Sequence, residues 1–225
     1  MRGYDTINRF LTNPAASFAE EDVSKFSMAC KAVTLFDRSH FLGLCWATGS
    51  ARRANVIGPL TDMFYFSVLT SAPDNETKAD LATKLAAMRY ATQAFKDTIA
   101  PLGAGANIQD PLIVIHTMIL LTSIRLDIAP SWTRSSVEDA LAAVALVDSA
   151  SFEYIGQVYP ILGSLLTAVG QVLVDELTRI RGLASKSKED DEQEMKMKNA
   201  TDRLAVVLRA CGADCPYICG YMLSS

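Results

Sequence analysis

Apolar residues recur with helical spacing over most of the chain. The first such stretch runs from about Ser17 or Ala19 to Phe41, and acidic residues occupy its first turn, where the helix dipole favours them. Its predicted core-facing stripe is Phe26, Cys30 and Val33, with Phe36 and Phe41 continuing it. A second predicted helix stops before Pro101. Its stripe is Leu81, Leu85, Met88, Phe95 and Ile99.

The most apolar stretch, "PLIVIHTMILLTSIRL", predicts a central helix with a defined start. Asp110 can act as its N-cap, and Pro111 suits the first helical position because its missing N–H is not needed there. We expect this helix to run to about Asp127, before Pro130.

Two more helices are predicted after the central one. The sequence "SSVE", Ser135 to Glu138, has capping-box spacing for a helix whose alanines allow close approach of neighbouring helices. A long helical region follows, in which Pro160 kinks or restarts the helix and Gly182 can cap its end.

The composition then changes abruptly to mixed charge, which indicates a solvated linker or a frayed helix end. Strand signals are almost absent, so the fold class predicted is all-α: an irregular multi-helix bundle in a single domain. We expect an N-terminal extension (1–16), a helical core (17–183), a charged linker (184–198) and C-terminal helices that pack back on the core (199–225).

Composition narrows the class of protein. The formal net charge of −4 argues against tight nucleic-acid binding, because neutralising phosphates needs a concentrated basic surface. Five cysteines in a chain without a secretory signal favour a soluble protein in a reducing compartment. Polar residues interrupt the two most apolar stretches, Pro111–Leu126 and Pro160–Val174, so we expect core helices and no membrane association.

Three cysteines near the end of the chain suggest a metal site: Cys211, Cys215 and Cys219 are evenly spaced by four residues. Gly212 and Pro216 favour a break between two helices, and structural zinc sites usually need four ligands in close pairs. We therefore predict packing thiols and no metal.

The remaining candidate chemistry is weak. A lone histidine in an apolar helix, His116, is more typical of a core residue than of a general base, and no nucleophile elbow or phosphate-binding loop is present. We therefore do not expect an enzyme. The alternative is a helical small-molecule-binding protein or enzyme with a pocket near His116 and the aromatic cluster Phe64–Phe66. The acidic run Glu189–Glu194 is flanked by lysines and predicts a solvated face.

Six stretches share one pattern of order and spacing: "FSMACKAVTLFDRSHF", "QAFKDTIAPL", "DPLIVIHTMILLTSIRLDIAP", "SSVEDALAAVALVDSA", the Tyr159-Pro160 helix and "LRACGADCPYICGYML". In this order they resemble the second half of the regulatory domain, or middle homology region, of fungal zinc-cluster transcription factors. The resemblance covers roughly residues 23–222 and rests on degenerate helical patterns.

The resemblance implies an all-helical nuclear regulatory domain that acts in transcription by RNA polymerase II. Its partners would be proteins of the transcription machinery, a DNA-binding module absent from this chain, or a small-molecule effector. The family's six-cysteine zinc cluster has no counterpart here, so we expect no zinc and no direct DNA binding by this segment. The chain would then be a fragment, a truncated product or a relative without that cluster.

Overall fold

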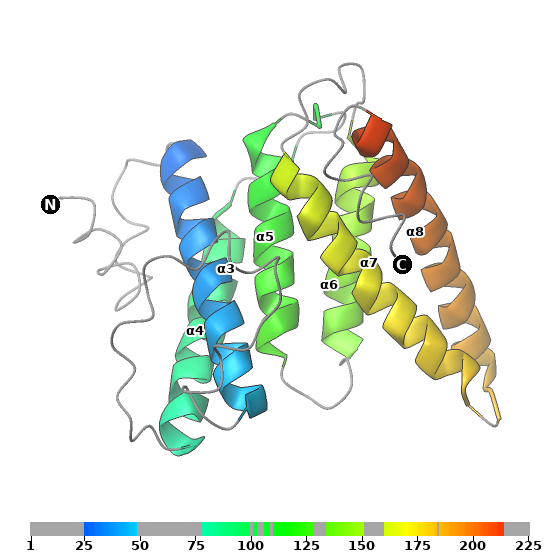
Figure 1. Cartoon of the computed structure of the whole chain (residues 1–225), viewed down its shortest axis with the longest axis horizontal. Coiled ribbons are helices and arrows are strands. Elements are labelled where there is room, and N and C mark those ends of the chain that lie inside the picture. The colour runs from blue at the N-terminus through cyan, green and yellow to red at the C-terminus, as the bar shows by residue number, and fades with distance from the viewer. Residues whose placement is uncertain are drawn as a thin grey trace, which may run out of the picture. The chain divides into compact units, whose positions relative to one another are not determined.

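The computed structural model describes residues 25–48, 78–99, 101–102, 106–108, 110–127, 134–150, 160–183 and 185–213. Within these ranges the chain forms six helices and no strand (Figure 1). The helices are α3 (Lys25–Thr48), α4 (Lys78–Thr98), α5 (Pro111–Leu126), α6 (Arg134–Asp148), α7 (Pro160–Arg181) and α8 (Lys188–Ala213). The expected all-α fold class is therefore confirmed.

The chain divides into two compact units. The first contains α3, α4 and residues 125–128, and the second contains residues 99–124 and everything from 129 onward. The expected helical core, 17–183, spans both units. Its boundary with the expected N-terminal extension lies outside the described residues.

In the first unit, α3 packs against α4 (Figure 1). The predicted stripe of α4 is correct, since all five of its residues are buried. Arg89 of α4 donates two hydrogen bonds to the carbonyl oxygen of Leu126, at 2.6 and 3.1 Å. The last four carbonyls of a helix have no partner within it, so this guanidinium satisfies one of them at the end of α5.

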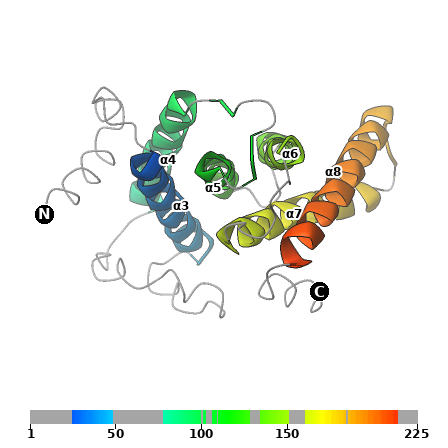
Figure 2. The ribbon, with the colours of Figure 1, turned by 90° about the horizontal axis from the view of Figure 1, so that it is seen from above.

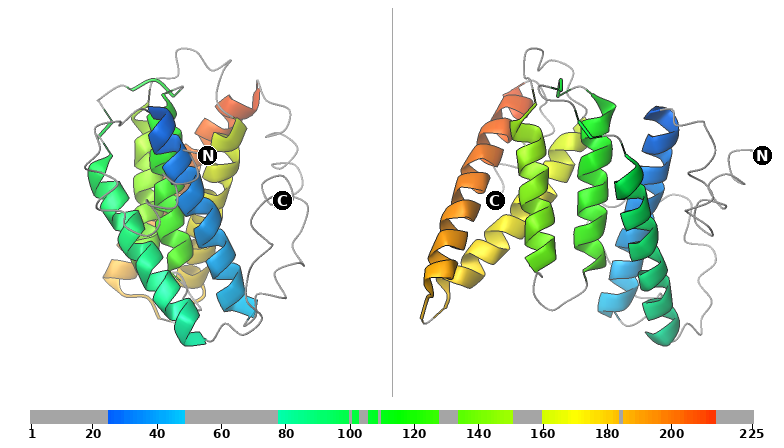
Figure 3. Two further views of the ribbon diagram at one scale, coloured as in Figure 1. Left: turned by 90° about the vertical axis from the view of Figure 1, so that its left-hand side faces the viewer. Right: turned by 180° about the vertical axis from the view of Figure 1, so that it is seen from behind.

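In the second unit, α6, α7 and α8 pack against one another, and α7 and α8 form a helical hairpin (Figures 2 and 3). One face of α7 is almost entirely aliphatic and buried; it includes Leu162, Leu166, Val169 and Leu173. Gly170 permits a close approach to α8, because a Cβ there would lie 3.2 Å from Leu204 Cδ2. This hairpin, together with α6, positions the candidate site.

Three predicted helix ends agree with the structure. Asp110 caps α5, since its carboxylate accepts a hydrogen bond from the Leu112 N–H at 3.0 Å, and Pro111 is the first helical residue. Pro160 begins α7, and Gly182 follows its last residue. The Gly182 N–H donates to the Thr178 carbonyl at 3.0 Å, which closes the helix.

The predicted stripe of α3 is wrong at two of its five positions, while Cys30, Phe36 and Phe41 are half-buried. Phe26 and Val33 are 78% and 42% exposed, and the buried face is instead formed by Ala32, Leu35, Ser39 and Leu42. Apolar residues surround much of this helix, so spacing alone did not select the face that meets α4. The helix also continues to Thr48, beyond the expected end at Phe41.

The predicted capping box at Ser135 is also wrong. The helix begins earlier, at Arg134, and the Glu138 carboxylate pairs with the Arg134 guanidinium at 3.1 Å. A capping box occurs instead at Ser187 and Asp190. There the Ser187 N–H donates to the Asp190 carboxylate at 2.8 Å, and the Asp190 N–H donates to Ser187 Oγ at 3.2 Å.

That second capping box corrects the expected linker, 184–198. From Lys188 onward the charged segment is the first half of α8, which continues without a break into the expected C-terminal helices and ends at Ala213. Glu194 is held by Arg181 and Lys186, at 2.8 and 2.5 Å, so contacts with residues outside α8 stabilise a segment that looks unstructured in isolation. The predicted fresh helix near Pro216 lies outside the described residues.

One described helix segment, Ile161–Arg181, is long and apolar enough to cross a membrane. Half of its most apolar window is buried inside the protein, as in the core helix of a soluble protein. The other apolar helix, α5, is shorter. These features are compatible with a soluble protein.

Candidate functional site

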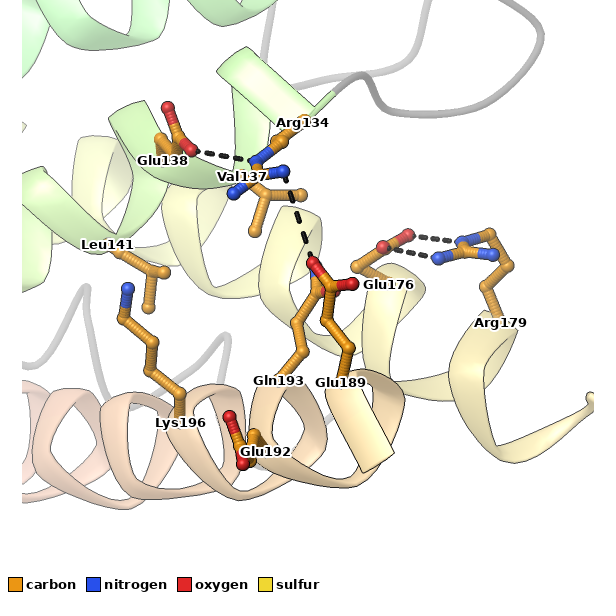
Figure 4. A pocket seen from close by; sticks show the side chains of 10 residues that line it. All are labelled: Arg134, Val137, Glu138, Leu141, Glu176, Arg179, Glu189, Glu192, Gln193 and Lys196. Atoms are coloured by element: carbon orange, nitrogen blue, oxygen red, sulfur yellow. Dashed lines mark hydrogen bonds and ion pairs between the residues drawn. The ribbon is translucent and has the colours of Figure 1, made fainter. Parts of the chain in front are cut away.

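A cleft of about 400 Å³ lies within the second unit, between α6, α7 and the first half of α8 (Figure 4). Its size is within the range of small-molecule sites. The lining residues come from all three helices and are mostly charged. They are Arg134, Val137, Glu138, Leu141, Glu176, Arg179, Glu189, Glu192, Gln193 and Lys196.

Arg134, in the first turn of α6, joins two sides of the cleft. Its Nε atom lies 3.1 Å from the Glu138 carboxylate on its own helix, and its guanidinium lies 4.0 Å from the Glu189 carboxylate on α8. All three side chains are more than half exposed, so water screens these ion pairs and each contributes little to stability. They can exchange partners at low cost.

Glu176 is the most buried charged group of the cleft, at 4% exposed. Both of its oxygens accept hydrogen bonds from Arg179, at 2.6 and 2.7 Å, a bidentate geometry that fixes both side chains. The same hydrogen bonds raise the pKa of Arg179. This pair forms a rigid, charge-balanced wall.

Lys196 lies at the Leu141 end of the cleft, and Figure 4 shows its side chain extending from α8 toward Leu141. Its ammonium group has no ion-pair or hydrogen-bond partner among the described residues. Gln193, one turn earlier on α8, is half-buried and likewise has no partner for its side-chain amide within the described ranges. Both of these polar groups are open to a ligand.

The apolar part of the cleft is formed by α6. Val137 is 3% exposed and Leu141 is half-buried. A ligand could place a hydrocarbon portion against these two side chains. The arrangement is suited to binding a small polar molecule with an apolar body.

The candidate-site residues singled out from the sequence that the structure describes do not line this cleft. His116 is half-buried on α5 and is not among the lining residues, and Phe64–Phe66 lie outside the described residues. Cys215 and Cys219 are outside them too, and α8 contains Cys211. No group of three or more His, Cys, Asp or Glu side chains within the described ranges is placed to hold a metal ion.

Sequence reasoning missed the cleft because its residues come from three separate stretches. The acidic run Glu189–Glu194 predicts a solvated face, but three of its residues, Glu189, Glu192 and Gln193, line the cleft. The signal that could have located it is the Ser187-x-x-Asp190 capping box, which begins α8 and thereby positions Glu189, Glu192 and Lys196.

Comparisons of the chain with family models, with curated proteins and with solved structures found no match.

Proposed function

We propose that this chain is a helical regulatory domain that controls transcription by RNA polymerase II in the nucleus. It would act through protein partners and a small effector, and it would depend on a separate module for DNA binding. The effector site is the cleft between α6, α7 and α8.

The helical structure of the matching stretches supports this proposal. The stretches that resemble the fungal regulatory domain fall on successive helices: "FSMACKAVTLFDRSHF" on α3, "QAFKDTIAPL" at the end of α4, and "DPLIVIHTMILLTSIRLDIAP" on and beside α5. The next stretch forms most of α6, and α7 starts at Pro160. Each of these stretches is helical over most of its described length, as an all-helical regulatory domain requires.

The cleft supports an effector-dependent mechanism. Its lining side chains come from three helices, so a molecule bound there contacts all three at once. A ligand that prefers one arrangement of these helices stabilises it by its difference in affinity. Such a change would alter the surface offered to a protein partner.

The test is a reporter assay with the full chain fused to a heterologous DNA-binding domain. We expect reporter output to differ from that of the DNA-binding domain alone, and Lys196→Met to alter it more than Lys198→Met. The second lysine lies on the same helix outside the cleft and is the matched control. Output equal to that of the DNA-binding domain alone, with the fusion present in the nucleus at comparable abundance, would contradict the proposal.

A further inference from the structure

The charges around the cleft are unevenly balanced. Its lining contains four carboxylates (Glu138, Glu176, Glu189 and Glu192) and three cations (Arg134, Arg179 and Lys196). Two of the carboxylates are matched one to one: Glu176 by Arg179, and Glu192 by Lys188, which lies outside the cleft, at 3.8 Å. The four other charged groups of the lining, Glu138, Glu189, Arg134 and Lys196, sum to zero, but they are unevenly distributed along the cleft.

One part of the cleft carries excess negative charge. Glu138 and Glu189 share a single cation, Arg134, at 3.1 and 4.0 Å, so the three groups together have a net charge of one negative unit. Arg134 lies between the two carboxylates, and a second cation placed beside them would balance their charge. An organic ammonium group on a ligand could supply it.

The part of the cleft near Leu141 carries excess positive charge. The Lys196 ammonium has no partner among the described residues, and Figure 4 shows it beside Leu141, apart from the Arg134 group. The half-buried amide of Gln193 is on the same helix, one turn away. A carboxylate placed here would gain a cation and an N–H donor.

We propose that the cleft binds a zwitterionic organic molecule. Its ammonium group would lie beside Glu138 and Glu189, its carboxylate at Lys196, and its hydrocarbon portion against Val137 and Leu141. This inference rests on the proposed function, because it names the chemical class of the effector.

The exposure of the charged groups determines the affinity, the salt dependence and the ligand preference that we expect. Arg134, Glu138 and Glu189 are 82%, 63% and 80% exposed, so a single ion pair there is worth little in water. A ligand that engages both ends gains from two such contacts and from the apolar surface between them. We therefore expect modest affinity that decreases with salt, and a clear preference for zwitterions over singly charged molecules.

The test is calorimetric titration of the full chain with matched probes. The zwitterions are γ-aminobutyrate, ε-aminocaproate and ω-aminocaprylate, a series that varies the distance between the two charges. Butyrate, caproate and caprylate lack the ammonium group, and the corresponding alkylammonium ions lack the carboxylate. We expect at least one zwitterion to bind about tenfold more tightly than either of its singly charged partners. Equal binding of all three forms at every length would overturn the proposal.

Substitutions test which part of the cleft binds each charged group of the zwitterion. Lys196→Met should reduce binding of the preferred zwitterion to that of its alkylammonium partner, whereas Lys198→Met should leave it unchanged. Conversely, the double substitution Glu138→Gln and Glu189→Gln should reduce binding of the preferred zwitterion to that of the matching carboxylate probe, which lacks the ammonium group. Both lysines are exposed, so neither substitution removes core packing. Unchanged zwitterion binding in Lys196→Met would also overturn the assignment.

These titrations are independent of the reporter assay. Zwitterion binding without any effect of the fusion on transcription would leave the cleft assignment standing and remove the regulatory function. An active fusion whose purified chain shows no preference for zwitterions would leave the regulatory function standing and remove the cleft assignment.

Discussion

His40 and Asp37 lie one turn apart on α3, where burial shifts their pKa values in opposite directions. Desolvation, together with the positive charge of Arg125, lowers the pKa of His40 from 6.5 to about 4. Burial raises the pKa of Asp37 above 3.8, partly offset by Arg38. Both effects follow from one cause, because burial disfavours whichever form of the group is charged.

His40 should therefore make stability depend on pH. As the pH falls from 6.5 toward 4, the unfolded chain takes up a proton on this ring that the folded chain resists, so the free energy of unfolding decreases. With the partial exposure of the ring allowed for, the loss should be about 2 kcal/mol. The measurement is urea unfolding of the native chain and of His40→Gln across this range.

The difference in the free energy of unfolding between the native chain and His40→Gln, followed over pH, isolates the contribution of His40. Asp37 acts in the opposite direction, since its raised pKa lets the folded chain take up a proton first, but it is present in both proteins. The substitution His116→Gln, at the chain's other histidine, is the matched control. A native chain and a His40→Gln variant with parallel pH profiles would contradict the assignment.

At the scale of single elements, α8 shows how a charged segment becomes helical. Asp190 accepts hydrogen bonds from both the Ser187 N–H and its hydroxyl, and these lower the pKa of the carboxyl group. The helix is then continued by Met197, Ala200 and Leu204, which are buried at helical spacing. Its charged first half is therefore fixed at one end by a cap and at the other by the core.

Ser187→Ala tests the cap. Loss of the N-cap hydroxyl should destabilise the protein by about 1 kcal/mol and should increase amide exchange in the first turn of α8. Ser185→Ala is the control, because Ser185 lies just outside the helix. The readouts are urea unfolding and hydrogen exchange of peptides that cover Lys188–Glu192.

Because the first turn of α8 carries Glu189 and Glu192, fraying there should also disturb the cleft. Equal exchange rates in Ser187→Ala and Ser185→Ala would show that the cap does not hold this turn.

At the scale of the whole molecule, stability depends on the aliphatic faces of the helices. On α7, neighbouring residues differ sharply: Leu173 is fully buried, and Val174 is 43% exposed. Truncating a buried leucine removes favourable transfer energy and leaves a cavity. The adjacent valine provides a matched control on the same helix.

We expect Leu173→Ala to lower the free energy of unfolding by about 3 kcal/mol and Val174→Ala to change it by about 0.5 kcal/mol or less. Chemical denaturation monitored by circular dichroism measures both. Similar losses for the two variants would mean that the face of α7 assigned to the core is wrong.

Local signals predicted the parts of the fold that depend on neighbouring residues. Asp110 and Pro111 defined the start of α5, and Gly182 defined the end of α7, because capping interactions act within one turn of a helix end. The stripe on α4 was equally clear, since polar residues separate its apolar positions. On α3, where apolar residues surround the helix, the stripe could not identify the buried face.

The candidate site was not predictable in the same way. The acidic run on α8 gave no indication of its partners, because Arg134, which pairs with Glu189, is distant in sequence. Its mixed charge was typical of a solvated segment, and only contacts such as Arg181–Glu194 show otherwise.

The sequence by itself therefore determined an all-helical chain and most of the helix ends that can be checked, because helical periodicity and capping are local properties. The tertiary structure decided which face of α3 is buried, that the charged segment joins α8, and that residues from α6, α7 and α8 surround one cleft. Those outcomes depend on contacts between side chains that are far apart in the sequence. Such contacts form only when the helices pack together.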